Sequence, residues 1–139
     1  MPVEFVDTNI LVYAYDQTAG QKYQRARELM ERLWESGDGT LSTQVLQEFH
    51  VTITSKIPRI IPARRARDII ADLGTWTVAV LELSDILNAS QLSERYRLHF
   101  WDALILAAAQ KEEAKILWSE DFNHGQNYGG VTVRNPFVS

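Results

Sequence analysis

The sequence predicts a three-layer α/β/α domain built around a central, mainly parallel sheet of four to five strands. Short apolar segments with strand character alternate with longer segments whose apolar residues recur at helical spacing, which is typical of strands joined by crossover helices. Acidic residues follow directly after two of the strand segments, at the edge where open α/β sheets bind ligands. The length of 139 residues, with 45% hydrophobic and 23% charged residues, fits one domain spanning residues 1–139.

In the N-terminal half, apolar periodicity and helix-boundary residues define the elements. The expected elements are strands over residues 3–6 and 40–42 and helices over 9–15, 21–35, 44–53 and 62–73. The carboxylate of Asp7 and the hydroxyl of Thr43 can cap the free amides of the helices that follow them. Gly37 and Gly74 end two helices, and Pro62 suits the first turn of another.

The C-terminal half continues the same alternation. The expected elements are strands over residues 76–81, 115–118 and 131–134 and helices over 84–96 and 102–109. Val78 and Val80 alternate along the first of these strands. Asp102 precedes a run of alanine, leucine and isoleucine that is the strongest helix-forming segment in the chain, and Gly130 leads into the last strand.

Composition excludes several classes of protein and site. The chain has no cysteine, which excludes disulfides and thiolate zinc sites, and its three histidines are too far apart for a histidine-rich zinc site. No apolar run approaches the roughly 18 residues of a membrane span, and the first residues lack the basic start of a signal peptide, so a cytoplasmic location is expected. The net charge of −4 argues against a generally basic nucleic-acid coat but is compatible with an acidic pocket that recruits a metal ion.

Four acidic residues mark the expected ligand-binding edge of the sheet. Asp7 and Asp121 follow strands, Asp102 begins the alanine-rich helix, and Glu48 borders the apolar stripe of its own helix. Carboxylates that converge without a lysine or arginine repel one another, and Mg²⁺ or Mn²⁺ relieves this repulsion because both ions prefer oxygen ligands. Each acid also has a purely structural explanation: a helix cap for Asp7 or Asp102, a solvated charge for Glu48, and loop chemistry for Asp121.

Five segments, taken in order, resemble a known family. They are residues 5–13 (FVDTNILVY), 47–49 (QEF), 100–109 (FWDALILAAA), 117–122 (LWSEDF) and 129–137 (GGVTVRNPF). Together they resemble the PIN domain over essentially the whole chain, and in particular the compact VapC-type toxins that are encoded beside an antitoxin. The resemblance implies a PIN-like fold formed by a single PIN domain.

The resemblance also implies a ribonuclease that depends on Mg²⁺ or Mn²⁺ and cleaves RNA to leave a 5′-phosphate and a 3′-hydroxyl. Its catalytic and metal-binding residues would be Asp7, Glu48, Asp102 and Asp121. Asn9 and Ser119 match positions that support the acids by hydrogen bonding. Glu120 departs from the pattern by placing two acids side by side, and we assign Asp121 because it stands two residues after Ser119. The implied partners are RNA, a cognate antitoxin and a second copy of the chain.

Basic and aromatic residues near the expected site are candidates for RNA contacts. The basic residues form two groups: Lys56, Arg59, Arg64, Arg65 and Arg67, and then Arg95, Arg97 and His99. Either group can guide phosphates or form a solvated helix face. Trp101 and Trp118 can stack on bases, although the apolar context of Trp118 favours a place in the core.

Two other functions stay open from the sequence alone. The chain can be a catalytically inactive PIN-like interaction domain, or another Mg²⁺-dependent phosphoryl-transfer enzyme. An aspartyl-nucleophile phosphatase would carry a second aspartate where Asn9 stands, and the sequence contains no P-loop or GxGxxG motif for a nucleotide. Metal-dependent cleavage of RNA by the purified protein distinguishes these functions.

Overall fold

A six-stranded sheet forms the centre of the computed structural model, which describes residues 2–55 and 61–138. The strands are β1 (Glu4–Val6), β2 (Gly39–Ser42), β3 (Thr77–Ala79), β4 (Ile116–Trp118), β5 (Asn127–Tyr128) and β6 (Val131–Arg134). They are ordered β3-β2-β1-β4-β6-β5, and every neighbouring pair is parallel except β5 and β6. The predicted mainly parallel α/β fold is therefore confirmed, with one strand more than expected.

The additional strand is β5, which pairs antiparallel with β6. Two residues are too few to show an alternating apolar pattern, so the sequence gives no periodicity for this strand. Gly129 and Gly130 join the two strands with φ of 61° and 103°, a backbone conformation that glycine adopts without steric cost. The expected strand over residues 76–81 is shorter, because only Thr77–Ala79 pairs with β2.

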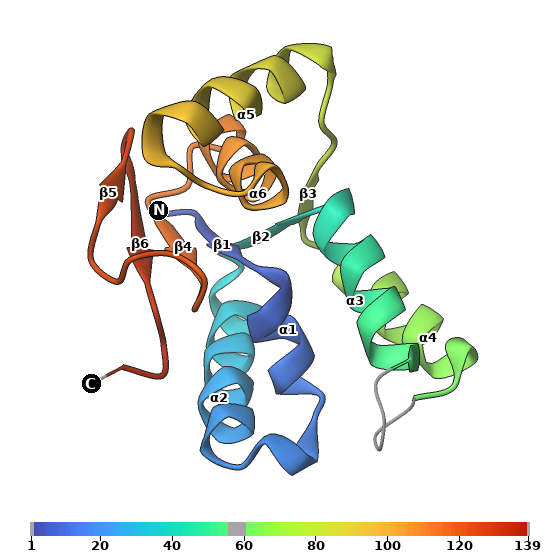
Figure 1. The fold of residues 1–139 in the computed structure, drawn as a ribbon. Coiled ribbons are helices and arrows are strands. Elements are labelled where there is room, and N and C mark those ends of the chain that lie inside the picture. The colour runs from blue at the N-terminus through green and yellow to red at the C-terminus, as the bar shows by residue number, and fades with distance from the viewer. Residues whose placement is uncertain (1, 56–60, 139) are drawn as a thin grey trace.

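The helices form layers on the two faces of the sheet. They are α1 (Thr8–Ala14), the 3₁₀ turn η1 (Gln17–Ala19), α2 (Gln21–Ser36), α3 (Thr43–Ser55), α4 (Ala63–Leu73), α5 (Leu83–Tyr96) and α6 (Phe100–Lys111). Helices α1 and α2 lie on one face and α5 and α6 on the other, while α3 and α4 lie side by side next to α1 (Figure 1). None of the described helices is both long and apolar enough to cross a membrane.

Buried apolar side chains from the strands join the layers. Phe5, Leu41 and Leu117 are fully buried on β1, β2 and β4, as the short apolar strand segments predict. Trp118 is partly buried against this core, and its indole N–H donates to Glu4 Oε1 at 2.8 Å. The expectation that Trp118 belongs to the core rather than to an RNA-binding surface is therefore confirmed.

The parallel register brings two chain segments together at the carboxyl ends of the central strands. Val6 of β1 is paired with Trp118 of β4, so the next residues, Asp7 and Ser119, emerge side by side. Asp7 is also the N-cap of α1, and its Oδ1 accepts from the Thr8 amide at 2.6 Å. The predicted cap at Asp102 is wrong: α6 begins earlier, at Phe100, and Asp102 lies in its first turn, where its carboxylate can face the sheet edge.

Candidate active site

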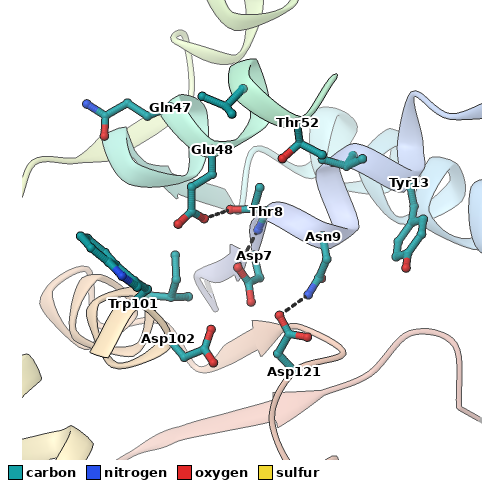
Figure 2. Close-up of a pocket in the computed structure, with 13 residues that line it drawn as sticks. Asp7, Thr8, Asn9, Tyr13, Gln47, Glu48, Thr52, Trp101, Asp102 and Asp121 are labelled. Atoms are coloured by element: carbon teal, nitrogen blue, oxygen red, sulfur yellow. Dashed lines mark hydrogen bonds between the residues drawn. The ribbon is translucent and has the colours of Figure 1, made fainter. Parts of the chain in front are cut away.

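A cavity of about 530 Å³ opens at the carboxyl edge of the sheet. Its walls come from the first turns of α1, from α3, from the first two turns of α6 and from the loop that follows β4 (Figure 2). All four predicted acids line it: Asp7, Glu48, Asp102 and Asp121. No lysine, arginine or histidine is among the described residues that line this cavity. The fold thus gathers acids that are more than a hundred residues apart in the sequence.

Asp7 is the buried centre of this group. Its side chain is held by the Thr8 amide on Oδ1 and by the Ser119 hydroxyl, which donates to Oδ2 at 2.7 Å. The pKa of Asp7 is raised from 3.8 to about 7, mainly by burial; the two hydrogen bonds oppose this increase, and the negative charges of Asp121 and Asp102 add to it. Asp7 therefore lies where a negative charge is costly unless a cation compensates it.

Asp121 is fixed by the two residues that were expected to support the acids. Asn9 Nδ2 donates to Asp121 Oδ2 at 2.8 Å, and the Asp121 amide donates to Ser119 Oγ at 3.0 Å (Figure 2 shows the first contact). Ser119 is fully buried and donates in turn to Asp7, so one hydroxyl connects both acids. Asn9 and Ser119 therefore each hydrogen-bond to one of the acids, as the positions implied by the family resemblance would do.

Glu48 is held by Thr8 and Gln44, neither of which is a site residue predicted from the sequence. Thr8 Oγ1 donates to Glu48 Oε1 at 2.6 Å, and Gln44 Nε2 donates to Glu48 Oε2 at 3.0 Å. The available sequence signals were the position of Gln44 one helical turn before Glu48 and the place of Thr8 between Asp7 and Asn9. Neither signal is specific, because polar residues at such positions are common on solvated helix faces.

Asp102 differs from the other three acids because no hydrogen bond reaches its carboxylate within residues 2–55 and 61–138. Its side chain is half-buried and points into the cavity from α6 (Figure 2). Burial raises the pKa of Asp102, the charges of Asp121 and Glu48 add to the increase, and His99 opposes it. The lone pairs of this carboxylate are therefore free to bind a ligand.

Glu120 points away from the acids. Its carboxylate accepts from the Tyr13 hydroxyl at 2.7 Å and from Lys22 Nζ at 2.9 Å. The ammonium of Lys22 also lies 5.0 Å from the centre of the Tyr13 ring and 5.4 Å from that of Phe137 near the C-terminal end. Of the two adjacent acids, Asp121 faces the cavity and Glu120 anchors the loop to α1 and α2.

The basic residues are less closely associated with the acids than expected. Lys56 and Arg59 lie outside the described residues. Arg64, Arg65 and Arg67 are exposed on α4, and Arg65 lines a separate cavity together with Tyr15 and Asp72. No basic residue of this stretch lines the acidic cavity within the described part of the chain.

The expected place of Arg95 beside the acids is corrected by the structure. Arg95 lines a cavity with Lys115 and Gly130, which precede β4 and β6, so it lies toward the opposite edge of the sheet. Arg97 is exposed just after α5, in a left-handed conformation with φ of 56°. Trp101, in contrast, stands at the acidic cavity with 65% of its surface exposed.

The donor set fits a hard divalent cation. Four carboxylates share one cavity that no basic residue lines among the described residues, and burial together with the neighbouring negative charges raises the pKa values of Asp7 and Asp102. Mg²⁺ and Mn²⁺ prefer oxygen ligands of this kind. Across the described residues, no three acidic or histidine side chains are grouped closely enough in this structure to hold a metal ion.

Comparison with known proteins identifies relatives of this architecture. The sequence profile of the PIN domain matches residues 5–128. No curated protein sequence matches the chain. Solved structures share its fold, among them three at 20% sequence identity or less.

The first is a toxin–antitoxin complex from Klebsiella pneumoniae, with a TM-score of 0.70, 20% identity and coverage of 96% of this chain and 98% of that one. The second is VapC20 from Mycobacterium tuberculosis, described as a sarcin–ricin loop cleaving toxin, with a TM-score of 0.67, 20% identity and coverage of 86% and 91%. The third is FitAB bound to the IR36 DNA fragment, with a TM-score of 0.72, 16% identity and coverage of 99% and 97%. Likeness at this identity establishes the fold.

Proposed function

The chain belongs to the PIN domain family, and on that premise we propose that it is a Mg²⁺- or Mn²⁺-dependent endoribonuclease, the toxin of a VapBC-type toxin–antitoxin pair. The observation that carries the proposal is the convergence of Asp7, Glu48, Asp102 and Asp121 in one cavity that no basic side chain lines among the described residues. The toxin–antitoxin complex from Klebsiella pneumoniae and the toxin VapC20, which share the fold, support the assignment to this class.

In this proposal the four carboxylates hold the cation, and the surrounding residues fix their positions. A bound Mg²⁺ or Mn²⁺ would supply a water of lowered pKa and neutralise charge on the scissile phosphate. Ser119 keeps Asp7 in place by donating to Oδ2, and Asn9 keeps Asp121 in place by donating to Oδ2. The buried carboxyl of Asp7 has a raised pKa, and a cation held in the cavity would lower that pKa and favour the ionised form that binds metal.

Cleavage of RNA by the purified protein tests this function. Total cellular RNA should be cut in Mg²⁺ or Mn²⁺ and left intact in EDTA, with 5′-phosphate and 3′-hydroxyl ends at the cut. A folded protein that binds its partner but leaves RNA intact at every metal concentration would indicate an inactive interaction domain instead. Hydrolysis of small phosphate esters without RNA cleavage would indicate another phosphoryl-transfer enzyme.

The two adjacent acids after β4 should differ in their effect on cleavage. Asp121→Asn removes a charge that faces the cavity, whereas Glu120→Gln changes a side chain that points to Tyr13 and Lys22. We expect about a hundredfold loss of cleavage or more for the first variant and less than about threefold for the second. Rates measured side by side check this, and an equal loss in both variants would show that the assignment of Asp121 is wrong.

Basic residues of α4 are proposed to contact RNA phosphates. Arg64→Ala combined with Arg67→Ala should flatten the dependence of log Kd on log salt concentration by about 0.7 for each lost contact with a single strand. Arg95→Ala is the matched control, because Arg95 lies toward the other edge of the sheet. Fluorescence anisotropy with labelled RNA in EDTA measures the slopes. An unchanged slope in the double variant would place the RNA elsewhere.

A cognate antitoxin is the proposed inhibitor, and it should compete with Mg²⁺. An arginine of the antitoxin inserted among the acids would pair with carboxylates that otherwise hold the cation. Titrating Mg²⁺ into the complex should therefore weaken toxin–antitoxin affinity, and an antitoxin lacking the inserted arginine should lose that dependence. Affinity that does not respond to Mg²⁺ would favour steric occlusion of the RNA instead. Assembly with a second copy of the chain stays a prediction from the family.

A further inference from the structure

The side chain of Gln44 connects the helices that carry two of the acids. Gln44 lies in the first turns of α3, and its Nε2 donates to Glu48 Oε2 at 3.0 Å and to the backbone oxygen of Trp101 at 3.1 Å. A side-chain amide nitrogen carries two hydrogens, so each contact uses one of them. Trp101 precedes Asp102 in the first turn of α6, and the amide therefore joins the segment of Glu48 to the segment of Asp102.

This position requires a neutral group that donates twice. Both partners are acceptors, one a carboxylate oxygen and the other a backbone carbonyl oxygen. A lysine or arginine could also donate to both, but it would bring a positive charge to a cavity whose carboxylates are proposed to hold a cation. A glutamate has the same shape but offers acceptors only. An amide is thus the side chain that satisfies both partners without neutralising the site.

The oxygen of the Gln44 side-chain amide helps to show which way the amide is oriented. Gln44 Oε1 is buried and has no hydrogen-bond partner among the described residues, which is a cost to stability. Rotating the amide by half a turn would place this oxygen against two other acceptor oxygens, on Glu48 and Trp101, and would be less stable because no hydrogen would lie between them. The observed orientation, in which both N–H groups donate to Glu48 and Trp101, is therefore the more stable of the two.

Glu48 is thereby held through both of its carboxylate oxygens, since Thr8 Oγ1 donates to Oε1 at 2.6 Å. Without Thr8 and Gln44, little would hold the Glu48 carboxylate in place, because its side chain is only partly buried and is repelled by the other acids. We propose that Gln44 is a positioning residue that holds Glu48 at the metal-binding cavity and fixes its distance from the first turn of α6. This inference rests on the proposed function.

Two substitutions test the proposal. Gln44→Met keeps the length of the side chain and removes both donors, and Gln44→Glu keeps its shape and replaces the donors by acceptors. Methionine and glutamate both favour helices, so α3 is expected to persist. Each variant should bind Mn²⁺ about 10- to 100-fold more weakly and lose kcat by a similar factor, the usual result of removing a partner that orients a metal ligand. KM for RNA should change little, because Gln44 does not contact the substrate in this proposal.

A double-mutant cycle separates positioning from a general structural role. If Gln44 acts through Glu48, Gln44→Met should cause no further loss of Mn²⁺ affinity in a Glu48→Gln background. Gln91→Glu on the exposed side of α5 is the control for an added charge, and it should bind Mn²⁺ like the wild type. Melting temperatures report whether each variant is folded, and either folded Gln44 variant decides the result.

A measurement on the unmodified protein does not depend on any variant. The two Gln44 side-chain amide hydrogens should exchange with water more slowly than those of the exposed Gln91, as NMR can measure. Wild-type Mn²⁺ affinity in a folded Gln44 variant, additive losses in the cycle, or equally fast exchange at both amides would overturn the proposal. If the wild type itself neither binds Mn²⁺ nor cleaves RNA, the proposed function fails instead.

Discussion

Asp102→Asn should abolish RNA cleavage while the protein keeps its fold. Among the four acids, Asp102 has the carboxylate that no hydrogen bond occupies within the described residues, and it points into the cavity (Figure 2). Loss of a ligand that holds a catalytic cation removes several kcal/mol of transition-state stabilisation, which corresponds to a decrease in rate of about a thousandfold or more. The same loss is expected for Asp7→Asn.

The melting temperature of these variants provides the second half of this test. The pKa of Asp102 is raised by burial and by the charges of Asp121 and Glu48, so its negative charge destabilises the metal-free protein. Removing that charge should keep or raise the melting temperature in EDTA. Asp68→Asn on the exposed face of α4 is the control and should change neither property. Cleavage at the wild-type rate in Asp102→Asn would show that the assigned metal site is wrong.

The metal-free protein should lose stability as the pH rises through the range in which Asp7 ionises. Burial raises the pKa of Asp7 from 3.8 to about 7 in the folded state. The folded state therefore binds the proton more tightly than the unfolded state, and this contribution is fully present below pH 4 and lost as the pH rises through 7. A shift of this size corresponds to about 4 kcal/mol in the free energy of unfolding.

Urea unfolding in EDTA between pH 4 and pH 8.5 measures this dependence. The difference between wild type and Asp7→Asn isolates the contribution of Asp7, since the other ionisable groups are common to both proteins. Asp7→Asn should become more stable than the wild type as the pH rises. Saturating Mg²⁺ should reduce this difference in the free energy of unfolding, because it binds the wild type. If this difference does not change with pH, the pKa of Asp7 is not raised in the folded state and Asp7 is already ionised at low pH.

The sequence predicted the sheet and the acidic edge because both follow from local signals. Asp7 and Ser119 directly follow two apolar strands, so parallel pairing of these strands is enough to bring the two residues together. The parallel pairing of Val6 with Trp118 does this. The contacts of Asn9 with Asp121 and of Ser119 with Asp7 agree with the supporting places that the family resemblance implied. These positions depend on the topology of the sheet, which the order of elements largely determines.

The features that could not be predicted depend on tertiary contacts. The amide of Gln44 reaches the backbone of Trp101, fifty-seven residues later in the sequence, and no local pattern indicates that contact. Glu120 turns away from the acids because Tyr13 and Lys22 lie beside it in the folded chain. Arg95 was placed near the acids because it is close to Asp102 in sequence, but the end of α5 lies over the opposite edge of the sheet.

Direct binding of Mn²⁺ tests the central claim most closely. Isothermal titration calorimetry on the wild type should detect Mn²⁺ binding in the absence of RNA, and Asp7→Asn, Glu48→Gln, Asp102→Asn and Asp121→Asn should each weaken it by about tenfold or more. Asp68→Asn should leave the affinity unchanged. Two results would contradict the account of a metal-dependent nuclease centred on these acids. One is wild-type Mn²⁺ affinity in all four single variants, and the other is RNA cleavage by the wild type in EDTA.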